Sequence, residues 1–413
     1  MSPTLPASLV VLLVAAGAAL VLLSGKIEKS TAWKATVTPL ASIIGSGFLV
    51  SVPLLAHEVG NWALLAMASL IAVAYVVGTA IRFNIRYVEP LLVAPAENES
   101  VRITQSLEHL SHFVLAFAYF ISVAYYLVLL GNFLLDGIGV ENEVAANAIA
   151  TAILALLGSL GLFRGLGMVE RIEKYTVAIN LAVIAGLLGG LLWYNGAMLV
   201  QGEWQLDATD PRFSLHTLQV LLGLLIVVQG FETSRFMDDE FDAETRIRTM
   251  RYAQWISAVV YVAFFAMLLA LFQFLGQRTS ITATIALVGH VAVVLPLLLT
   301  VGAVASQFSA SVADSVGCAG LLEDIASKRL NLRHAYPLIA MIAISIIWST
   351  DVFEIIALAS RAFALFYLVQ TFVALSVAWE SRDVENRAGH IALFFVGASL
   401  CLCIVLFGIP SAG

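Results

Sequence analysis

Charged side chains are scarce in this sequence. They make up 12% of its 413 residues, whereas a soluble domain averages about 25%. Hydrophobic residues make up 61%, and the mean hydropathy is +0.95. This composition excludes an ordinary soluble domain, so we expect an integral membrane protein that crosses the bilayer several times.

Cysteines are few, and metal-binding clusters and basic patches are missing. The three cysteines (Cys318, Cys401 and Cys403) lie in apolar stretches without CxxC spacing, which argues against a disulfide framework or a cysteine zinc site. His109 and His112 have a spacing that suits metal ligands, but no third cluster lies near them in the sequence. The net charge is −7 without a basic patch, so we expect no nucleic-acid partner. Since no nucleophile–base pair stands out, we expect no enzyme and no cofactor beyond a simple ion.

The sequence does contain a series of long apolar runs. A transmembrane helix needs about 20 predominantly apolar residues. Windows of that length predict twelve spans, at 6–24, 38–57, 62–82, 110–135, 144–163, 173–194, 215–234, 252–275, 293–316, 335–349, 354–379 and 390–410.

The lysines and arginines predict the orientation of these spans. If the loop after the first span is cytoplasmic, 18 of the 21 basic residues lie on the cytoplasmic side, as the positive-inside rule requires. Both termini are then outside. No positive charge precedes the first span, so we interpret it as a retained helix and not as a cleaved signal peptide. We expect a multi-pass protein of the cell membrane, in a bacterium the inner membrane.

Two of the predicted spans contain residues that a continuous helix disfavours. Gly45-Ser46-Gly47 lies at the centre of span 38–57, although glycine costs roughly 0.8–1 kcal/mol in a helix interior. The stretch QGFETS (229–234) interrupts span 215–234 in the same way. The two spans open two groups of five spans with opposite orientation, and such matching interruptions indicate a transport site near the bilayer midplane. The alternative for the two glycines is close helix packing.

We therefore expect an all-α membrane protein with a 5+5 inverted repeat and broken first and sixth core helices. Its predicted parts are an accessory N-terminal helix with a linker (1–37), the first repeat (38–194), an external loop (195–214), the second repeat (215–380) and a C-terminal helix (381–413). The sequence leaves the oligomeric state open.

Three motifs carry a resemblance to a known family. They are IIGSGFLVSVP (43–53), VVQGFETSRFMDDEFD (227–242) and SQFSASVADSVGCAGLLED (306–324). They resemble the first, sixth and eighth core helices of the amino acid–polyamine–organocation (APC) superfamily, whose members are transporters with the LeuT-type fold. The resemblance implies that the amides of Ser46 and Gly47 face a substrate carboxylate. The implied substrate-binding residues are Ile44, Gly45, Ser46, Gly47, Gly230, Phe231, Glu232 and Thr233.

The same resemblance implies a Na+ site made by the carbonyls of Ala41 and Ile44 and the side chains of Ser306 and Ser309. The two serines are three residues apart and share a helix face, and hard oxygen ligands suit a hard cation. The alternative is that these serines bond to carbonyls of their own helix. Proton-coupled members commonly carry a lysine within the fifth core helix. This chain has none there after Lys174, which favours sodium or exchange.

Three ionisable residues fall within or beside the predicted spans, where a charge costs at least roughly 2.5–3.5 kcal/mol. Glu232 lies in the predicted break, where it is either a proton site or gate partner, or a cap for the unwound backbone. Arg361 either contacts an anionic substrate or pairs with a buried carboxylate such as Glu232 or Asp314. We expect Asp314 itself to line the inner exit.

We expect a secondary active transporter of a small organic solute, with an amino acid or amine as the leading class, that works by alternating access with Na+ coupling. Two alternatives stay open: a proton-coupled or exchange-type transporter that uses Glu232, and a transporter-like membrane sensor. The stretch LLIVVQ before Gly230 lacks the aromatic gate that amino acid exchangers often have, so the substrate class stays open. The expected partners are the solute and the lipid bilayer.

Overall fold

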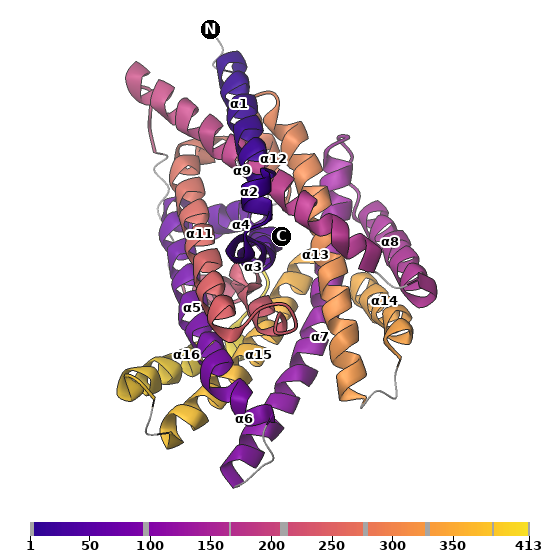
Figure 1. Cartoon of the computed structure of the whole chain (residues 1–413). Coiled ribbons are helices and arrows are strands. Elements are labelled where there is room, and N and C mark those ends of the chain that lie inside the picture. The colour runs from indigo at the N-terminus through magenta and orange to yellow at the C-terminus, as the bar shows by residue number, and fades with distance from the viewer. Residues whose placement is uncertain are drawn as a thin grey trace.

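A computed structural model describes residues 4–93, 99–164, 167–206, 214–275, 280–326, 331–381 and 384–411. Every regular element within these ranges is a helix, and Figure 1 shows the helices gathered into one bundle. The all-helical prediction is therefore confirmed for the described part of the chain. Of the predicted external loop, residues 195–201 belong to a helix, and residues 207–213 lie outside the described ranges.

Ten helical segments in the described ranges are long and apolar enough to cross a membrane. Each contains most of one predicted span, and the segment Ser51–Leu92 also includes the end of span 38–57. The helices that form them are α1 (Thr4–Leu22), α5 (Ala63–Phe83), α7 (Glu99–Asp136), α8 (Glu143–Arg164), α9 (Gly167–Gln201), α11 (Ala243–Leu268), α13 (Leu295–Ile325), α14 (Leu332–Ser349), α15 (Val352–Glu380) and α16 (Arg387–Phe407). The two remaining predicted spans, 38–57 and 215–234, are discontinuous, so a total of twelve stays a prediction.

The first of these discontinuous segments consists of α3 (Thr31–Gly47) and α4 (Ser51–Val59). The sequence predicted the interruption at Gly45–Gly47, but α3 continues through Gly47 and the turn falls at Phe48–Val50. The reason is a close approach between backbones: a Cβ on Gly47 would lie 2.4 Å from Cβ of Val227. Close packing, the alternative considered for this glycine, is the role that Gly47 has here.

The second discontinuous segment consists of α10 (Leu215–Leu222) and two short 3-10 helices, η3 (Leu225–Val228) and η4 (Phe231–Phe236). The chain leaves helical geometry at Gln229 and Gly230, where the φ of Gly230 is +116°. A side chain at Gly230 would also collide with α3, because its Cβ would lie 2.5 Å from Cβ of Ser42. This interruption lies within the stretch that the sequence indicated.

The short elements join these helices. They are α2 (Gly25–Glu28), the 3-10 helix η1 (Gly60–Trp62), the π-helical turn η2 (Asn84–Val88), α6 (Glu89–Val93), the 3-10 helix η5 (Leu269–Phe274) and α12 (Ala283–Gly289). The π-helical turn continues α5 without a gap, so α5, η2 and α6 form one bent rod.

Helices from the two halves of the chain pack against each other in pairs. In these pairs α3 contacts η3 and η4, α5 contacts α11, α7 contacts α13, and α8 contacts α14. Figure 1 shows the α8–α14 pair at one side of the bundle. Helix α7 lies at the centre, packed against both α13 and α15, and most of its apolar span is buried. The 5+5 inverted repeat stays a prediction, and this pairing is the arrangement that it requires.

The first helix is packed onto the bundle along α9. A Cβ added to Gly186 would lie 2.8 Å from the carbonyl oxygen of Val11, and one on Gly190 would lie 2.5 Å from the Val11 side chain. These glycines let the backbones of α1 and α9 approach closely. In a membrane there is no hydrophobic driving force between helices, so such close packing is what holds them together. At the other end of the chain, α16 packs against α15 and α5.

Candidate functional site

A small cavity lies between α3, α9 and α13. Its volume is about 20 Å³, and the four residues predicted for the ion, Ala41, Ile44, Ser306 and Ser309, all line it. They come from the last turns of α3 and the middle of α13, which pack against each other. The structure therefore brings together residues that are more than 260 positions apart in the sequence.

Ser306 and Ser309, the two serines of α13 at this cavity, differ from other serines of that helix. Ser311 donates to the carbonyl of Phe308 at 2.8 Å, and Ser315 donates to the carbonyl of Ser311 at 2.6 Å. Within the described part of the chain, the hydroxyls of Ser306 and Ser309 have no hydrogen-bond partner. Bonding back to their own helix, the alternative for these two serines, describes Ser311 and Ser315 instead.

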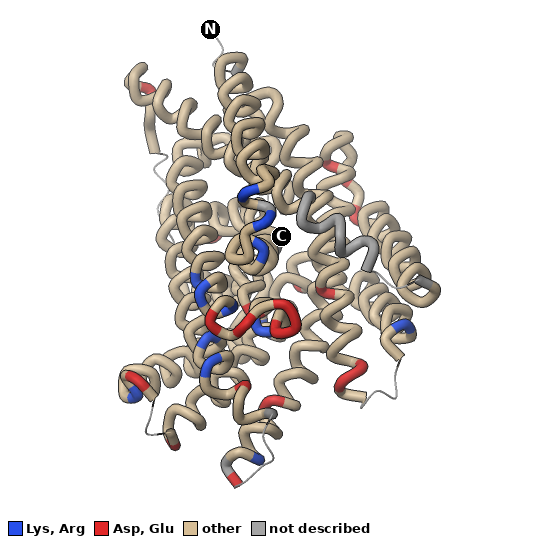
Figure 2. Tube along the Cα trace, viewed as in Figure 1, with Lys and Arg blue, Asp and Glu red and all other residues tan. Residues whose placement is uncertain are grey.

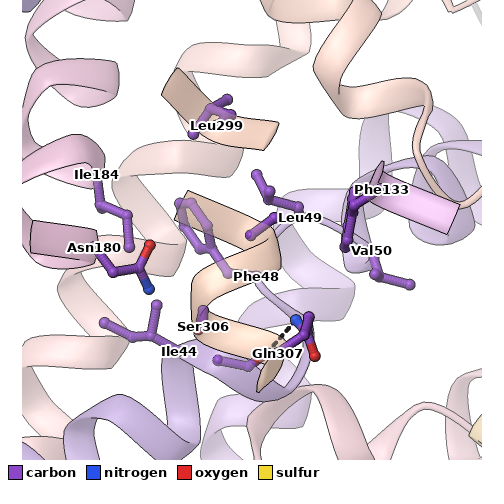
Figure 3. A pocket seen from close by; sticks show the side chains of 13 residues that line it. Ile44, Phe48, Leu49, Val50, Phe133, Asn180, Ile184, Leu299, Ser306 and Gln307 are labelled. Carbon is purple, nitrogen blue, oxygen red and sulfur yellow. Dashed lines mark hydrogen bonds between the residues drawn. The ribbon is translucent and has the colours of Figure 1, made fainter. Parts of the chain in front are cut away.

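A second cavity of about 30 Å³ adjoins the first, and Ile44, Asn180 and Ser306 line both. Figure 3 shows three polar side chains, Asn180, Ser306 and Gln307, in the lower half of the view and Leu299 at the top. Its other walls are apolar or backbone: Gly45, Gly47, Phe48, Leu49, Val50, Phe133, Ile184 and Ala303. The volume has room for about two water molecules, so the site is closed to an organic solute in this conformation.

Gln307 connects α13 to the end of α3. Its side-chain Nε2 donates to the carbonyl of Gly45 at 2.9 Å, which Figure 3 marks with a dashed line. Its Oε1 is buried and has no hydrogen-bond partner among the described residues. A buried acceptor without a donor is costly, so this oxygen is available to a ligand that carries an N–H or O–H group.

The predicted residues in and just before η4 pack against neighbouring segments, among them α3. Phe231 is fully buried and stacks on the ring of Tyr367, with centroids 5.1 Å apart. Thr233 donates its hydroxyl hydrogen to the carbonyl of Gly230 at 2.8 Å. None of Gly230, Phe231, Glu232 and Thr233 lines either cavity. These residues therefore share no cavity with Ile44, Gly45 and Gly47, which line the second cavity.

Glu232 holds the interrupted backbone in place. Its Oε2 accepts hydrogen bonds from the N–H of Gly230 at 3.0 Å and from the hydroxyl of Tyr367 at 2.6 Å. The side chain is buried. This is the geometry of the backbone cap that was one of its two predicted roles.

The remaining predicted residues are Ser46, Asp314 and Arg361, and they lie on three different helices. Ser46 belongs to the last turn of α3, and its side chain lies outside the described residues. Asp314 is buried on α13, where the hydroxyl of Ser122 on α7 donates to it, and it lines neither cavity. Arg361 is exposed, and its Nε donates to the carbonyl of Val405 on α16 at 2.9 Å. The expected contact of Arg361 with Glu232 or Asp314 is therefore not formed.

Arg361 does not reach Glu232 or Asp314 because of its position in the helical period of α15. Ser360, Phe363, Tyr367 and Gln370 share the buried face that contacts the broken segments, and Ser360 accepts from the N–H of Ile226 at 3.0 Å. Arg361 follows Ser360 directly, so its side chain points about 100° away from that face, toward α16.

Sequence reasoning missed several residues of the site. Asn180 and Thr176 on α9 line the first cavity, and Asn180 is a polar residue in the apolar run TVAINLAVIAGLL. That interruption was a usable signal. Tyr261 on α11 was hidden among other aromatic residues; its hydroxyl lies 3.1 Å from the carbonyl oxygen of Ile43 and 2.6 Å from that of Val227. It therefore ties the two broken segments together where they are closest.

A buried polar network closes the end of the bundle that the charge distribution assigns to the cytoplasm. Arg235 on η4 lies 3.0 Å from the carboxylate of Glu108 on α7 and also donates to Gln370 on α15. Gln370 in turn donates to Glu108 at 3.1 Å and accepts from Asn84 at 2.7 Å. His112 lies 3.3 Å from the same carboxylate. The network joins the broken segment to α7 and α15.

Comparison with known proteins agrees with this architecture. A family model described as an APC superfamily transporter matches residues 25–408. An uncharacterized protein of Aquifex aeolicus is 39% identical over 387 residues, which cover 94% of this chain and 93% of that protein. The match includes both broken segments and the helices that line the two cavities, and with it the predicted resemblance is confirmed. The chain belongs to the APC superfamily of transporters.

Proposed function

We propose that the protein is a secondary active transporter that moves a small organic solute, an amino acid or an amine, by alternating access coupled to Na+. The observation that carries the ion coupling is the first cavity. Its lining joins residues of α3 with Ser306 and Ser309, whose hydroxyls have no hydrogen-bond partner in the described residues. Unpaired polar groups in an apolar bundle cost free energy, and a bound cation would offset that cost.

The chemistry of the donors fits a small hard cation. Carbonyl and hydroxyl oxygens suit alkali and alkaline-earth ions, whereas softer metals prefer imidazole or thiolate. The carbonyl of Ile44 accepts from the N–H of Phe48 at 3.3 Å and keeps a second lone pair for an ion. Among the described residues, no carboxylate lines this cavity. A site of neutral oxygens favours a monovalent over a divalent ion, because it offers a divalent charge no compensation.

The moving part that we propose is the unit of α3–α4, α5, α10–η4 and α11. Within this unit Tyr261 joins α3 to η3, and Gln254 donates to the carbonyl of Ala74 on α5 at 3.0 Å. Its contacts with the rest of the bundle include separate polar bonds, such as Gln307 to Gly45 and Arg235 to Glu108. Hydrogen bonds of this kind can exchange between two arrangements. The pairing of helices across the two halves supports the same rocking motion.

The second cavity is our candidate for part of the solute site. Its mostly apolar lining and polar end suit a solute with an apolar body and an N–H donor for Oε1 of Gln307. The solute enters after α3 or its neighbours move, because the closed volume admits only water. We place the protein in the bacterial inner membrane on the basis of the relative from Aquifex aeolicus.

One observation favours a second candidate, proton coupling through Glu232. This carboxylate is buried between Gly230 and Tyr367 and forms no ion pair in the described part of the chain. A group of this kind can carry a proton across the membrane if it alternates between the two sides.

Uptake by purified protein in liposomes tests the proposal. Labelled amino acids and amines are screened under an imposed inward Na+ gradient, an inward proton gradient, or neither. Na+-driven uptake that persists in Glu232→Gln supports Na+ coupling. Uptake driven only by protons and lost in Glu232→Gln supports the second candidate. Uptake indifferent to both gradients refutes ion coupling, and no uptake of any organic solute argues against transport of this class.

A further inference from the structure

The largest of the cavities described here is separate from the transport site. It has a volume of about 170 Å³ and lies between the end of α5 with η2, the start of α11 and the start of α16. These ends share the side of the bundle that the basic residues assign to the cytoplasm. Its lining is Thr79, Arg82, Phe83, Arg86, Tyr87, Ile247, Arg251, Glu385, Asn386 and His390. Figure 2 shows blue positions gathered at the lower left, where α5 and α11 run together.

Arg82 is the buried charge of this cavity. Its side chain is only 6% exposed and lies over the ring of Tyr75, with the guanidinium carbon 4.8 Å from the ring centroid. It donates to Oε1 of Gln254 and, at 2.7 Å, to the hydroxyl of Thr79. These partners are neutral, and within the described ranges no carboxylate lies within ion-pair distance of Arg82. A buried guanidinium without a counter-ion is strongly unfavourable.

A second arginine increases the local charge. Arg251 is exposed, has no hydrogen-bond or ion-pair partner in the described part of the chain, and is close enough to Arg82 for the two charges to repel. Arg86 is already paired with Glu244 at 2.5 Å. Glu385 is an acidic residue of the lining, and it makes no ion pair with any of these arginines among the described residues.

The start of α16 adds a further preference for negative charge. Asn386, the residue before the first helical position, has a φ of +50°, and its side chain does not cap the helix. Among the described residues, the first backbone N–H groups of this 21-residue helix therefore lack a capping side chain, and the two arginines beside them lack a carboxylate partner. Free N–H groups and the helix dipole both favour an anion at such a position.

We propose that this cavity binds a phosphate oxyanion, held by Arg82 and Arg251 at the start of α16. Guanidinium groups match phosphate with paired, charge-assisted hydrogen bonds. The same chemistry comes from two sources, the headgroup of an anionic phospholipid in the cytoplasmic leaflet or a soluble phosphate. Basic pockets between transmembrane helices on that side recognise anionic headgroups. The site is independent of the cavities beside α3, so it can act on stability or on transport from outside the transport path.

The test uses the full-length protein, with thermal unfolding as the readout. One arm adds inorganic phosphate to protein in detergent, with chloride at equal ionic strength as reference. The other arm compares nanodiscs of phosphatidylcholine with nanodiscs that contain phosphatidylglycerol. The key variant is Arg251→Gln, because an exposed arginine can be replaced without endangering folding. Its matched control is Arg248→Gln, an exposed arginine on the same helix that does not line the cavity.

For a soluble phosphate we expect a saturable rise in melting temperature, with the half-saturating concentration about tenfold higher in Arg251→Gln and unchanged in Arg248→Gln. For a lipid headgroup we expect no effect of phosphate, a higher melting temperature with phosphatidylglycerol, and loss of most of that rise in Arg251→Gln alone. The proposal is overturned if neither anion shifts the melting temperature. It is equally overturned if both variants respond like the wild type or lose the shift equally.

Discussion

Replacing Ser309 by alanine removes one of the hydroxyls that line the proposed ion cavity. The Ser309 hydroxyl has no hydrogen-bond partner among the described residues, so the substitution breaks no internal bond. We therefore expect the free energy of unfolding without Na+ to change by roughly 0.5 kcal/mol or less. An oxygen contact to a charged group is worth about 1.5–3 kcal/mol. The Na+ concentration for half-maximal response should then rise roughly 10- to 100-fold.

Two measurements report this change. Thermal unfolding in detergent is followed as Na+ replaces a large organic cation at constant ionic strength, and uptake in liposomes is followed as external Na+ is varied. The matched control is Ser311→Ala, two residues along the same helix. Its hydroxyl donates to the carbonyl of Phe308, so we expect this variant to lose about 0.5–1.5 kcal/mol of stability and to keep the Na+ response of the wild type.

Ser309→Ala should thus change the Na+ response and not the stability, whereas Ser311→Ala should change the stability and not the Na+ response. Equal Na+ responses in the wild type, Ser309→Ala and Ser311→Ala would show that the ion does not bind at this cavity. A wild type that is indifferent to Na+ in both assays would refute the coupling itself. Uptake without Na+ dependence would then leave transport standing with another driving force.

Three further substitutions test the packing around the broken segments by thermal unfolding. Gly230→Ala should cost about 2 kcal/mol or more, because alanine disfavours φ of +116° and its Cβ would collide with α3. Tyr261→Phe should cost about 1–3 kcal/mol, because it removes the only hydroxyl hydrogen shared by two buried carbonyls. Arg235→Gln should cost about 3–5 kcal/mol, because it leaves the Glu108 carboxylate buried without its counter-ion.

Each of the three has a control. Gly17→Ala in α1 has open space around the new methyl group and should not destabilise the protein. Tyr252→Phe removes the hydroxyl of an exposed tyrosine on the same helix as Tyr261 and should have little effect. Adding Glu108→Gln to Arg235→Gln should restore part of the lost stability, since the unpaired charge disappears. A double variant as unstable as Arg235→Gln would contradict the ion-pair argument.

Hydropathy alone was sufficient to predict the continuous membrane helices. A run of apolar residues is a local property, and ten helical segments of the structure match runs that the sequence shows. Glycines within the two spans indicated both interruptions, but only one of the glycines lies in the interruption itself. At Gly230 the glycine supplies the backbone angle of the break itself. At Gly47 it makes room for Val227, and the break follows it by one residue, which no local pattern reveals.

The candidate site was predictable as far as the resemblance supplied pairs of distant residues. Ala41, Ile44, Ser306 and Ser309 meet at one cavity, although the sequence has no spacing that connects them. The contacts of Arg361 could not be predicted from the sequence. Its place in a span gives its depth in the membrane, but the direction of its side chain depends on which face of α15 is buried. That face is set by neighbouring helices, and so is tertiary information.

Residues of α3 line both cavities. A movement of this helix therefore affects the proposed ion site and the proposed solute site together. A 100-fold difference in Na+ affinity between two conformations corresponds to about 2.7 kcal/mol. This exceeds the net value of one hydrogen bond such as Gln307 to Gly45, at about 0.5–1.5 kcal/mol. The same difference is smaller than the cost of breaking a buried ion pair such as Arg235 with Glu108, which is about 3–5 kcal/mol. On these magnitudes Na+ bound as proposed would shift α3, but it would not open the cytoplasmic network without a contribution from the solute, which is the condition for coupled transport.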